Sequence, residues 1–443
     1  MTENDTRTKV NAAESAALEL AQLDDQTRSE ALRAIATAID EHRSEILDAN
    51  ETDVAEAREM LEEGEYSQVL VDRLTLDDEK IDSIVEMVRS VAGQEDPLGE
   101  TREARELDDG LELYKVSVPI GVIGTVFESR PDALVQIASL SLKSGNAVIL
   151  KGGSEALHSN RVLYRIIREA TADVIEDWAH LIEAHEAVDV VLEMDEKIDL
   201  LMPRGSTEFV RYIQENTQIP VLGHTEGICH VYVDAEADLE MATDITYDAK
   251  VQYPAVCNAA ETLLVHEDVA EDVLPLIAAR YREAGVEMRG DDRTREIIEA
   301  DPATEADWGT EYGDLVISIR VVDSLPTATQ HVNTYGSKHT ESIVTDDADN
   351  ASAFMRGVDA ASVFHNASTR FADGYRYGLG AEVGISTGKI HARGPVGLEG
   401  LTTYKYYLEG EGQQVATYAG ADAAPFTHEA FEGEWNPGHL SGE

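Results

Sequence analysis

The chain has 443 residues, of which 43% are hydrophobic and 28% are charged, a balance that excludes a collagen-like, coiled-coil or wholly disordered chain. Its length predicts two large domains with an accessory element. The 87 acidic and 35 basic residues leave a formal net charge of −52, which argues against any nucleic-acid partner bound through its phosphate backbone.

The negative charge is dispersed along the chain. Acidic pairs such as Asp40-Glu41 and Asp291-Asp292 recur in helical stretches, and only ten of the 35 basic residues are lysines. An acidic tail would indicate an interaction segment, whereas a dispersed acidic surface is typical of a protein that stays soluble in concentrated salt. We therefore expect a halophilic protein whose fold loses stability when salt is removed.

Neither a secretion signal nor a membrane span is predicted. The first residues are polar, and the most apolar segment, 116–127, is interrupted by proline and glycine, well short of the roughly 18 apolar residues that a span needs. The two cysteines, Cys229 and Cys257, are too few for a disulfide framework. We expect a soluble, cytoplasmic protein.

The first predicted elements in chain order are helices. Apolar residues recur at helical spacing from about residue 14 to 61, and the pattern continues over 84–91. Asp109-Gly110 then lies between two strand-like runs, which is a strong signal for a β-hairpin. A β-arm is therefore predicted to leave the helical region.

Strands and helices alternate after the arm. Strand-like runs at 118–126, 145–153 and 198–202 are each followed by a helical stretch. This alternation predicts an α/β fold with parallel sheets, in which ligands bind beyond the carboxyl ends of the strands.

A second alternating section begins at residue 230. Its expected strands are 230–233, 315–322, 342–344 and 361–364, and its expected helices are 238–250 and 267–284. The acidic stretch 291–307 is expected to be a surface excursion. A late strand, 401–408, is placed to pair with the arm, and the polar tail after Thr427 is expected to be frayed.

Cys257 is the candidate nucleophile. It follows Pro254 in a turn that leads into an apolar strand, and such a cysteine forms a thioester when nearby dipoles or cations lower its pKa. The alternative is a small buried hydrophobic residue, which is our interpretation of Cys229. The two cysteines lack the CxxC and HxxxH spacings of zinc sites, so no metal site is expected.

Arginines are informative because basic residues are scarce. Guanidinium groups among hydroxyls and free backbone N–H groups suit carboxylate or phosphate oxygens, although ordinary surface arginines are the alternative. Four lie in predicted turns with such neighbours: Arg130, Arg204, Arg370 and Arg393.

Candidate nucleotide contacts are Lys151, which ends a strand, and Gly205-Ser206, which open a helix. No GxGxxG motif follows any predicted strand, so the standard Rossmann fingerprint is absent.

Further motifs occur in order along nearly the whole chain. They are Pro119-Ile120-Gly121-Val122-Ile123-Gly124, Glu128-Ser129-Arg130-Pro131, Lys151-Gly152-Gly153, Pro203-Arg204-Gly205, Gly223-His224, Gly227-Ile228-Cys229-His230, Val256-Cys257-Asn258-Ala259, Asn366 to Phe371, Gly380-Ala381-Glu382-Val383-Gly384-Ile385-Ser386-Thr387 and His391-Ala392-Arg393-Gly394-Pro395. Together they closely resemble the motifs of the gamma-glutamyl phosphate reductase family, within the aldehyde dehydrogenase superfamily.

The resemblance implies an aldehyde dehydrogenase-like fold with two α/β domains and a β-arm for oligomerisation. The active site is expected in the cleft between the two domains. The expected ranges are 1–100 and 119–225 for the nucleotide-binding domain, 226–400 for the catalytic domain, 101–118 and 401–425 for the arm, and 426–443 for a C-terminal tail.

The resemblance also implies an activity, the NADPH-dependent reduction of L-glutamyl 5-phosphate to glutamate 5-semialdehyde with release of phosphate. This is the second step of proline synthesis from glutamate. Cys257 would attack the acyl phosphate and form a thioester, while its backbone N–H and Arg130 serve the oxyanion or the leaving phosphate. His224 stands in place of the glutamate base of hydrolytic relatives, with Glu226 as the alternative, and Asn258 completes the expected catalytic set.

Binding residues are carried over in the same way. Ser154 stands where NAD-preferring relatives often carry a glutamate, and this favours NADP. The expected cofactor residues are Lys151, Ser154, Gly205, Ser206 and Glu311. The expected substrate residues are Ser129, Arg130, Asn366, Ser368, Thr369, Arg370 and Arg393.

The chain departs from the family pattern at Asp132, where asparagine is usual, and at Tyr253, where arginine is usual. The alternatives are a hydrolytic or CoA-acylating aldehyde dehydrogenase and a non-catalytic scaffold that keeps the fold. A homo-oligomer is expected, and a glutamate 5-kinase is a candidate partner.

Overall fold

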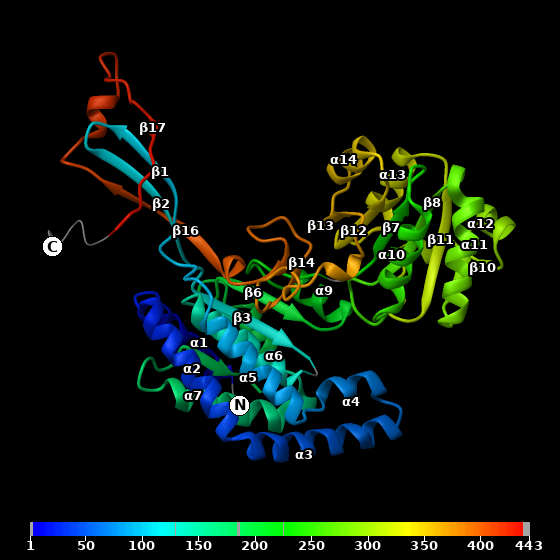
Figure 1. The fold of residues 1–443 in the computed structure, drawn as a ribbon. Coiled ribbons are helices and arrows are strands. Elements are labelled where there is room, and N and C mark those ends of the chain that lie inside the picture. Colours follow the sequence, from blue (N-terminus) through cyan, green and yellow to red (C-terminus); the bar gives the residue numbers. More distant parts are fainter. Residues whose placement is uncertain (1–2, 129, 184–186, 225, 437–443) are drawn as a thin grey trace.

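The computed structural model describes residues 3–128, 130–183, 187–224 and 226–436. Figure 1 shows two α/β units side by side and a slender β-arm that projects away from both. No helix within the described ranges has the length and apolarity needed to span a membrane.

The N-terminal part is helical, as predicted. Its helices are α1 (Glu3–Leu20), α2 (Asp25–Glu41), α3 (Arg43–Glu62), α4 (Gln68–Leu74) and α5 (Asp78–Ala92). The side chain of Asp24 caps α2 by accepting from the Thr27 N–H. The apolar face of α2, with Leu32, Ile35 and Ile39, is fully buried. Helices α2 and α5 belong to the core on one face of the first sheet, whereas Val10 and Ala13 of α1 pack on the other face.

The first sheet is parallel and has the order β5-β4-β3-β6. Its strands are β3 (Val122–Phe127), β4 (Ala147–Gly152), β5 (Ala179–Leu181) and β6 (Leu200–Arg204). The connecting helices are α6 (Pro131–Lys143), α7 (Leu157–Thr171) and α8 (Ala187–Leu192), and α9 (Thr207–Glu215) follows β6. The alternation predicted from the sequence is confirmed.

The second sheet is also parallel and has the order β10-β9-β11-β8-β7-β12-β13. Its strands are β7 (Cys229–Val233), β8 (Ala260–His266), β9 (Glu287–Gly290), β10 (Asp301–Pro302), β11 (Val316–Val322), β12 (Thr340–Val344) and β13 (Ser362–His365). Its helices are α10 (Leu239–Val251), α11 (Glu267–Glu283), α12 (Asp292–Ile297), α13 (Leu325–Tyr335) and α14 (Ala348–Gly357).

The arm is an antiparallel sheet with the order β16-β2-β1-β17. Its strands are β1 (Thr101–Asp108), β2 (Leu111–Pro119), β16 (Thr402–Glu409) and β17 (Glu429–Ala430). Gly110 makes the hairpin turn with a φ of 66°. The predicted hairpin and the predicted pairing of the late strand with the arm are both confirmed.

The expectation of a frayed tail after Thr427 is wrong for the described residues up to 436. Strand β17 pairs with β1, and the Trp435 ring stacks on Tyr407 with 4.0 Å between ring centroids. The indole N–H also donates to Glu409 Oε1 at 2.8 Å. Aromatic stacking therefore holds a segment that composition alone marks as loose.

The chain returns to the first domain before it enters the arm for the second time. Strands β14 (Gly384–Ser386) and β15 (Gly394–Val396) form a small antiparallel pair. Val383, Leu398 and Leu401 pack in the same apolar core as the first sheet and its helices. The end of the expected catalytic range, 226–400, is thus part of the first domain by its packing.

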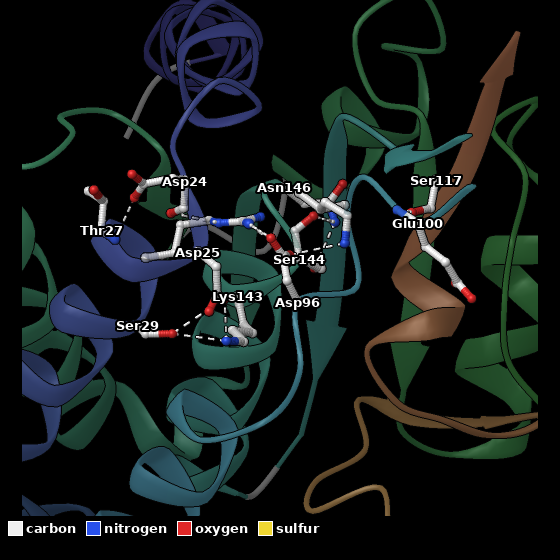
Figure 2. A network of polar contacts seen from close by, with 12 residues as sticks. Asp24, Asp25, Thr27, Ser29, Asp96, Glu100, Ser117, Lys143, Ser144 and Asn146 are labelled. Carbon is white, nitrogen blue, oxygen red and sulfur yellow. Dashed lines mark hydrogen bonds and ion pairs between the residues drawn. The ribbon is translucent and has the colours of Figure 1, made fainter. Parts of the chain in front are cut away.

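A polar network joins the arm to the first domain (Figure 2). Asn146 accepts from the Gly121 N–H at 2.8 Å, and it donates to the Leu401 carbonyl at 2.8 Å. Its amide also donates to the hydroxyl of Ser144 at 2.8 Å. This buried asparagine therefore ties three distant parts of the chain together at the base of the arm.

Two buried cations complete this region. Arg28 donates to both carboxylate oxygens of Asp96 at 2.8 Å. Lys143, at the end of α6, pairs with Asp25 and donates to the Ser29 hydroxyl at 2.9 Å. Bidentate and hydrogen-bonded pairs of this kind fix the helices against the base of the arm.

Candidate functional site

Cys257 lies in the loop 252–259, between α10 and β8. The loop is tightened by a hydrogen bond from the Ala259 N–H to the Val256 carbonyl at 2.9 Å. A Cβ on Gly227 would lie 2.2 Å from the Cys257 carbonyl oxygen, so only glycine allows the segment before β7 to pass this closely. Cys257 as a residue remains partly exposed.

Asn258 fixes the other side of this loop. It is buried, and its amide donates to the Ala372 carbonyl at 2.8 Å. Its Oδ1 is buried without a hydrogen-bond partner in the described part of the chain. The geometry makes Asn258 an anchor of the loop, with one acceptor oxygen left over.

The electrostatic surroundings of Cys257 are mixed. Burial raises the pKa of the thiol to about 12, the charges of Glu311 and Glu382 add to this, and Arg204 opposes it. Burial lowers the pKa of both Arg204 and Arg370, and the charge of Cys257 acts on each of them. Two arginines from different domains therefore lie within electrostatic range of Cys257.

These arginines reach the site from separate elements. Arg204 ends β6 of the first sheet. Arg370 lies in the 3₁₀ turn Thr369–Phe371, and its Nε donates to Gln252 Oε1 in the nucleophile loop at 2.9 Å. The site is assembled across the two α/β units, which is the cleft expected from the sequence.

His224 lies beside Cys257 together with His339, which precedes β12. One donor atom from each of these three residues lies within 4.8 Å of the others. His224 Nδ1 donates to the Ile385 carbonyl at 3.1 Å, and burial lowers the pKa of this histidine. Glu226, the alternative to His224, instead pairs with Arg211 at 3.3 Å.

A cavity of about 500 Å³ opens next to the nucleophile loop. Tyr253 and Ala255 line it from that loop, and Arg130 and Asp132 line it from the start of α6. Arg73 of α4 also lines the cavity and donates to the Ala255 carbonyl at 3.4 Å. Both departures from the family pattern, Asp132 and Tyr253, are thus in one cavity with Arg130.

The expected cofactor residues of the first domain lie at the carboxyl ends of adjacent parallel strands. Lys151 ends β4, is buried, and donates to the Gly152 carbonyl at 2.6 Å. Ser154 is exposed just beyond it. After β6, the Ser206 N–H donates to Glu128 Oε2 at 3.0 Å. Because β4, β3 and β6 are neighbouring parallel strands, these residues lie together at the carboxyl end of the sheet.

Glu311 reaches the nucleophile from the second domain. Burial raises the pKa of its carboxyl, and the backbone N–H of Gly227 opposes this rise. Gly313, two residues later, donates its N–H to Glu261 Oε1 at 3.2 Å, and Glu261 pairs with Lys250 at 2.7 Å. A buried ion pair therefore supports the segment that carries Glu311.

Other expected substrate residues have structural contacts. Asn366 bonds to the backbone N–H and carbonyl of Thr345, each at 3.0 Å. Ser368 caps the turn of Arg370, whereas the Thr369 hydroxyl is buried and has no partner among the residues described. Arg393 pairs with Asp359 at 3.0 Å. Ser129 lies outside the described residues.

Sequence reasoning missed His339 and Glu382. Glu382 lies in a motif that we quoted for the family resemblance, and its Oε2 accepts from the Gly374 N–H at 2.8 Å. His339 lies in the polar run Ser337-Lys338-His339 before a buried strand. The sequence offered only one signal for His339, its position directly before a buried strand. Its neighbours in space are over 80 residues away in the chain.

Comparisons with known proteins place this geometry in a family. The family model of the aldehyde dehydrogenase family matches residues 1–297. A gamma-glutamyl phosphate reductase of Natronomonas pharaonis is 74% identical over 439 residues, which are 99% of this chain and 100% of that protein. One of Haloquadratum walsbyi is 68% identical over 435 residues, which are 96% of this chain and 95% of that protein.

Solved structures agree with the sequence comparison. The crystal structure of gamma-glutamyl phosphate reductase from Thermotoga maritima has a TM-score of 0.90 and 43% sequence identity, and the match covers 92% of this chain and 99% of that one. The chain therefore belongs to the gamma-glutamyl phosphate reductases of the aldehyde dehydrogenase family, which are oxidoreductases acting on an aldehyde or oxo group.

Proposed function

We propose that this enzyme reduces L-glutamyl 5-phosphate to glutamate 5-semialdehyde with NADPH and releases phosphate, as the second step of proline biosynthesis. The names of its relatives support this reaction. The single observation that carries the proposal is the position of Cys257, a partly exposed residue beside His224 and within electrostatic range of Arg204 and Arg370.

The chemistry follows from these groups. The sulfur of Cys257 forms a bond to the acyl carbon, and the bond from that carbon to the phosphate oxygen breaks. The thiol proton passes to the Nε2 atom of His224, whose Nδ1 is already bonded to the Ile385 carbonyl. The leaving phosphate takes up hydrogen bonds from the arginines, and the Cys257 backbone N–H stabilises the oxyanion.

The substrate carries an ammonium and two kinds of anionic group. Within the cavity of about 500 Å³, Arg130 and Arg73 suit the phosphate and carboxylate oxygens. The carboxylate of Asp132 suits the ammonium group. We propose that the amino-acid end of the substrate lies in this cavity, with its acyl carbon directed towards Cys257.

The residues at the edge of the first sheet fit a dinucleotide by their chemistry. Lys151, Ser154 and Ser206 supply ammonium and hydroxyl donors for ribose and phosphate oxygens, and Ser154 is exposed. NADPH, when bound, supplies the hydride that reduces the thioester. Glu311 would hold the nicotinamide ribose, because it lies close to Cys257.

The cofactor preference has its own test. A Ser154→Glu substitution places a carboxylate where the 2′-phosphate of NADPH would lie, and it should lower kcat/KM for NADPH by about tenfold or more. The value for NADH should change much less. Equal losses with both cofactors would remove the assignment of Ser154.

The reaction is tested in reverse, in high-salt buffer, by following NADPH formation from glutamate 5-semialdehyde and NADP with and without phosphate. We expect strict dependence on phosphate and no turnover in a folded Cys257→Ala variant. Turnover without phosphate would favour a hydrolytic dehydrogenase. An inactive, well-folded native enzyme would favour a scaffold.

We also propose that the chain forms a homo-oligomer through the arm. Strand β16 is an edge strand and exposes Tyr404, Tyr406 and Leu408, and such edges pair with another chain unless they are covered. Light scattering of a Tyr406→Asp variant should then show smaller particles than the native protein does. An unchanged mass would contradict this use of β16.

The remaining proposals concern the setting of the enzyme. We propose a cytoplasmic, halophilic protein that receives its unstable acyl phosphate from a glutamate 5-kinase. Circular dichroism at decreasing salt should show loss of structure, because the net charge of −52 is no longer screened. An equally stable fold without added salt would contradict the halophilic assignment.

A further inference from the structure

The cluster of His224, Cys257 and His339 has the donor set of a metal site. The three side chains come from the segment before β7, the nucleophile loop and the segment before β12. One donor atom of each lies within 4.8 Å of the other two. Two imidazoles and a thiolate are ligands that Zn²⁺ prefers, whereas Mg²⁺ and Ca²⁺ prefer oxygen.

The hydrogen bond of His224 leaves a lone pair on its Nε2, and that of His339 is compatible with one on its Nε2, because a hydroxyl can accept from Nδ1. A carbonyl oxygen only accepts, so the bond of 3.1 Å to Ile385 places the proton of His224 on Nδ1 and the lone pair on Nε2. His339 Nδ1 lies 2.8 Å from the Thr340 hydroxyl. The Nε2 atom of His339 is buried and, in the ranges described, has no hydrogen-bond partner.

An unpartnered buried nitrogen is costly unless something binds it. The two rings meet edge to face with their centroids 5.3 Å apart. His339 is only 1% exposed, so bulk water does not reach its Nε2. A cation shared with His224 and Cys257 would satisfy this nitrogen.

A second layer of contacts supports the three donors. The Cys229 thiol donates to the Cys257 carbonyl at 3.2 Å, and its sulfur lies 3.8 Å from His339 Nδ1. The Ile385 carbonyl orients His224 in the same way. Metal-binding histidines characteristically have their second nitrogen held by such a partner.

The dimensions also fit. Zinc binds nitrogen at about 2.0–2.1 Å and sulfur at about 2.3 Å, so tetrahedral donors lie about 3.5 Å apart. The donors here must close by roughly 1 Å, which side-chain rotation supplies. The negative charges of Glu311 and Glu382 act on Cys257 and favour a cation there. They offset the positive charge of Arg204, which opposes one.

We propose that His224, Cys257 and His339 bind one zinc-like divalent cation in the free enzyme, with water as the fourth ligand, and that this cation holds the nucleophile inactive. His224 and Cys257 are each partly exposed residues, whereas His339 is buried. Because the cation and the acyl group need the same sulfur, metal and acyl substrate exclude each other. The proposal does not depend on which acyl substrate the enzyme uses.

The test is a titration of the metal-free, full-length protein with Co²⁺ in high-salt buffer. We expect one ion per chain, with a thiolate-to-cobalt charge-transfer band and the visible bands of a tetrahedral ion. The band should vanish in Cys257→Ala. His224→Gln and His339→Gln should each weaken Co²⁺ binding by about 10-fold to 100-fold.

A matched control is His180→Gln. The Nε2 of His180 is likewise buried without a described hydrogen bond, although Asp177 Oδ1 lies 3.8 Å away, and it lies in β5 of the other domain. This variant should bind Co²⁺ as the native protein does, and thermal unfolding should show that all variants are folded. The proposal is overturned if Co²⁺ does not bind at one ion per chain, or if both cluster histidine variants keep the native affinity.

Inhibition gives a second readout. Zn²⁺ should inhibit turnover in competition with the acyl substrate, and a chelator should restore the rate. Inhibition that persists unchanged in folded His339→Gln would overturn the assignment of His339.

Discussion

Two buried asparagines, Asn146 at the base of the arm and Asn258 beside the nucleophile, use their amides in opposite ways. Both the oxygen and the nitrogen of Asn146 are bonded, to Gly121 and Leu401 respectively, and its nitrogen also donates to Ser144 (Figure 2). Asn258 bonds through its nitrogen alone, and its oxygen has no partner in the described chain.

The same contrast extends to the neighbours of these asparagines. Lys143 at the base of the arm is paired with Asp25 and Ser29, whereas near the nucleophile the Thr369 hydroxyl and His339 Nε2 are buried without described partners. Satisfied polar groups stabilise a fold, and unsatisfied ones mark places where a ligand completes the bonding. Arg28 Nη1 at the arm junction is also buried without a described partner, so the contrast concerns the two asparagines and not every polar group of the two regions.

The largest expected effect is on activity alone. Cys257→Ala should lower kcat by on the order of 10⁴-fold or more, because no other group forms the thioester. Its free energy of unfolding should stay within about 1 kcal/mol of the native value. Steady-state kinetics and urea unfolding of the same preparation check both parts, and a residual rate near the native one would place the nucleophile elsewhere.

The next largest effect is on stability alone. Asn146→Ala leaves the Gly121 N–H and the Leu401 carbonyl without their hydrogen-bond partner in the interior. The free energy of unfolding should therefore fall by on the order of 3 kcal/mol. Asn333→Ala is the matched control, since Asn333 also makes two backbone bonds but is exposed. The free energy of unfolding of Asn333→Ala should fall by less than about 1 kcal/mol. Similar losses for both variants would contradict the special role of the buried Asn146.

A third expectation concerns the loss of stability at acidic pH. Burial lowers the pKa of His331 to about 2, and neighbouring His230 and Arg320 contribute. The unfolded chain takes up a proton near pH 6.5 and the folded one does not, so stability falls by up to about 1.4 kcal/mol per unit as the pH drops below that value. His331→Gln keeps an acceptor for Arg320 and should flatten this slope between pH 6 and 4 in urea titrations. An unchanged slope would remove His331 from the acid response.

The smallest expected effect is the most discriminating. Thr369→Val removes a buried hydroxyl that has no described partner, so the free energy of unfolding should stay level or rise by about 0.5 kcal/mol. If the hydroxyl binds substrate, KM for the acyl substrate should rise several-fold. A loss of stability above about 1 kcal/mol, with KM unchanged, would make Thr369 a structural residue like Asn146.

The sequence alone allowed a prediction of much of this fold. Periodicity identified the parallel strands, and Asp109-Gly110 identified the hairpin. These signals are local, because strand alternation and turn chemistry depend on neighbouring residues. The turn at Pro254 left Cys257 open as a nucleophile or a small buried residue, and only the family resemblance made it the expected nucleophile. The family resemblance added Glu311, which does lie near Cys257.

Other features depend on packing between distant segments and were not predicted. His339 reaches Cys257 only because β12 is next to β7 in the sheet. Leu398 and Leu401 return to the first core, and Trp435 is held by Tyr407. Arg393 has the right surroundings in sequence but pairs with Asp359. None of these partners can be read from spacing along one chain.

The return of the chain to its first domain sets an order of events during synthesis. The core of the second domain lies between Val231 and Val363, so that unit can fold once this stretch has left the ribosome. The first domain begins at the N-terminus but lacks Leu401, the bond from Asn146 and strand β16 until nearly the last residues emerge. The part of the enzyme that is made first is therefore the part that is finished last.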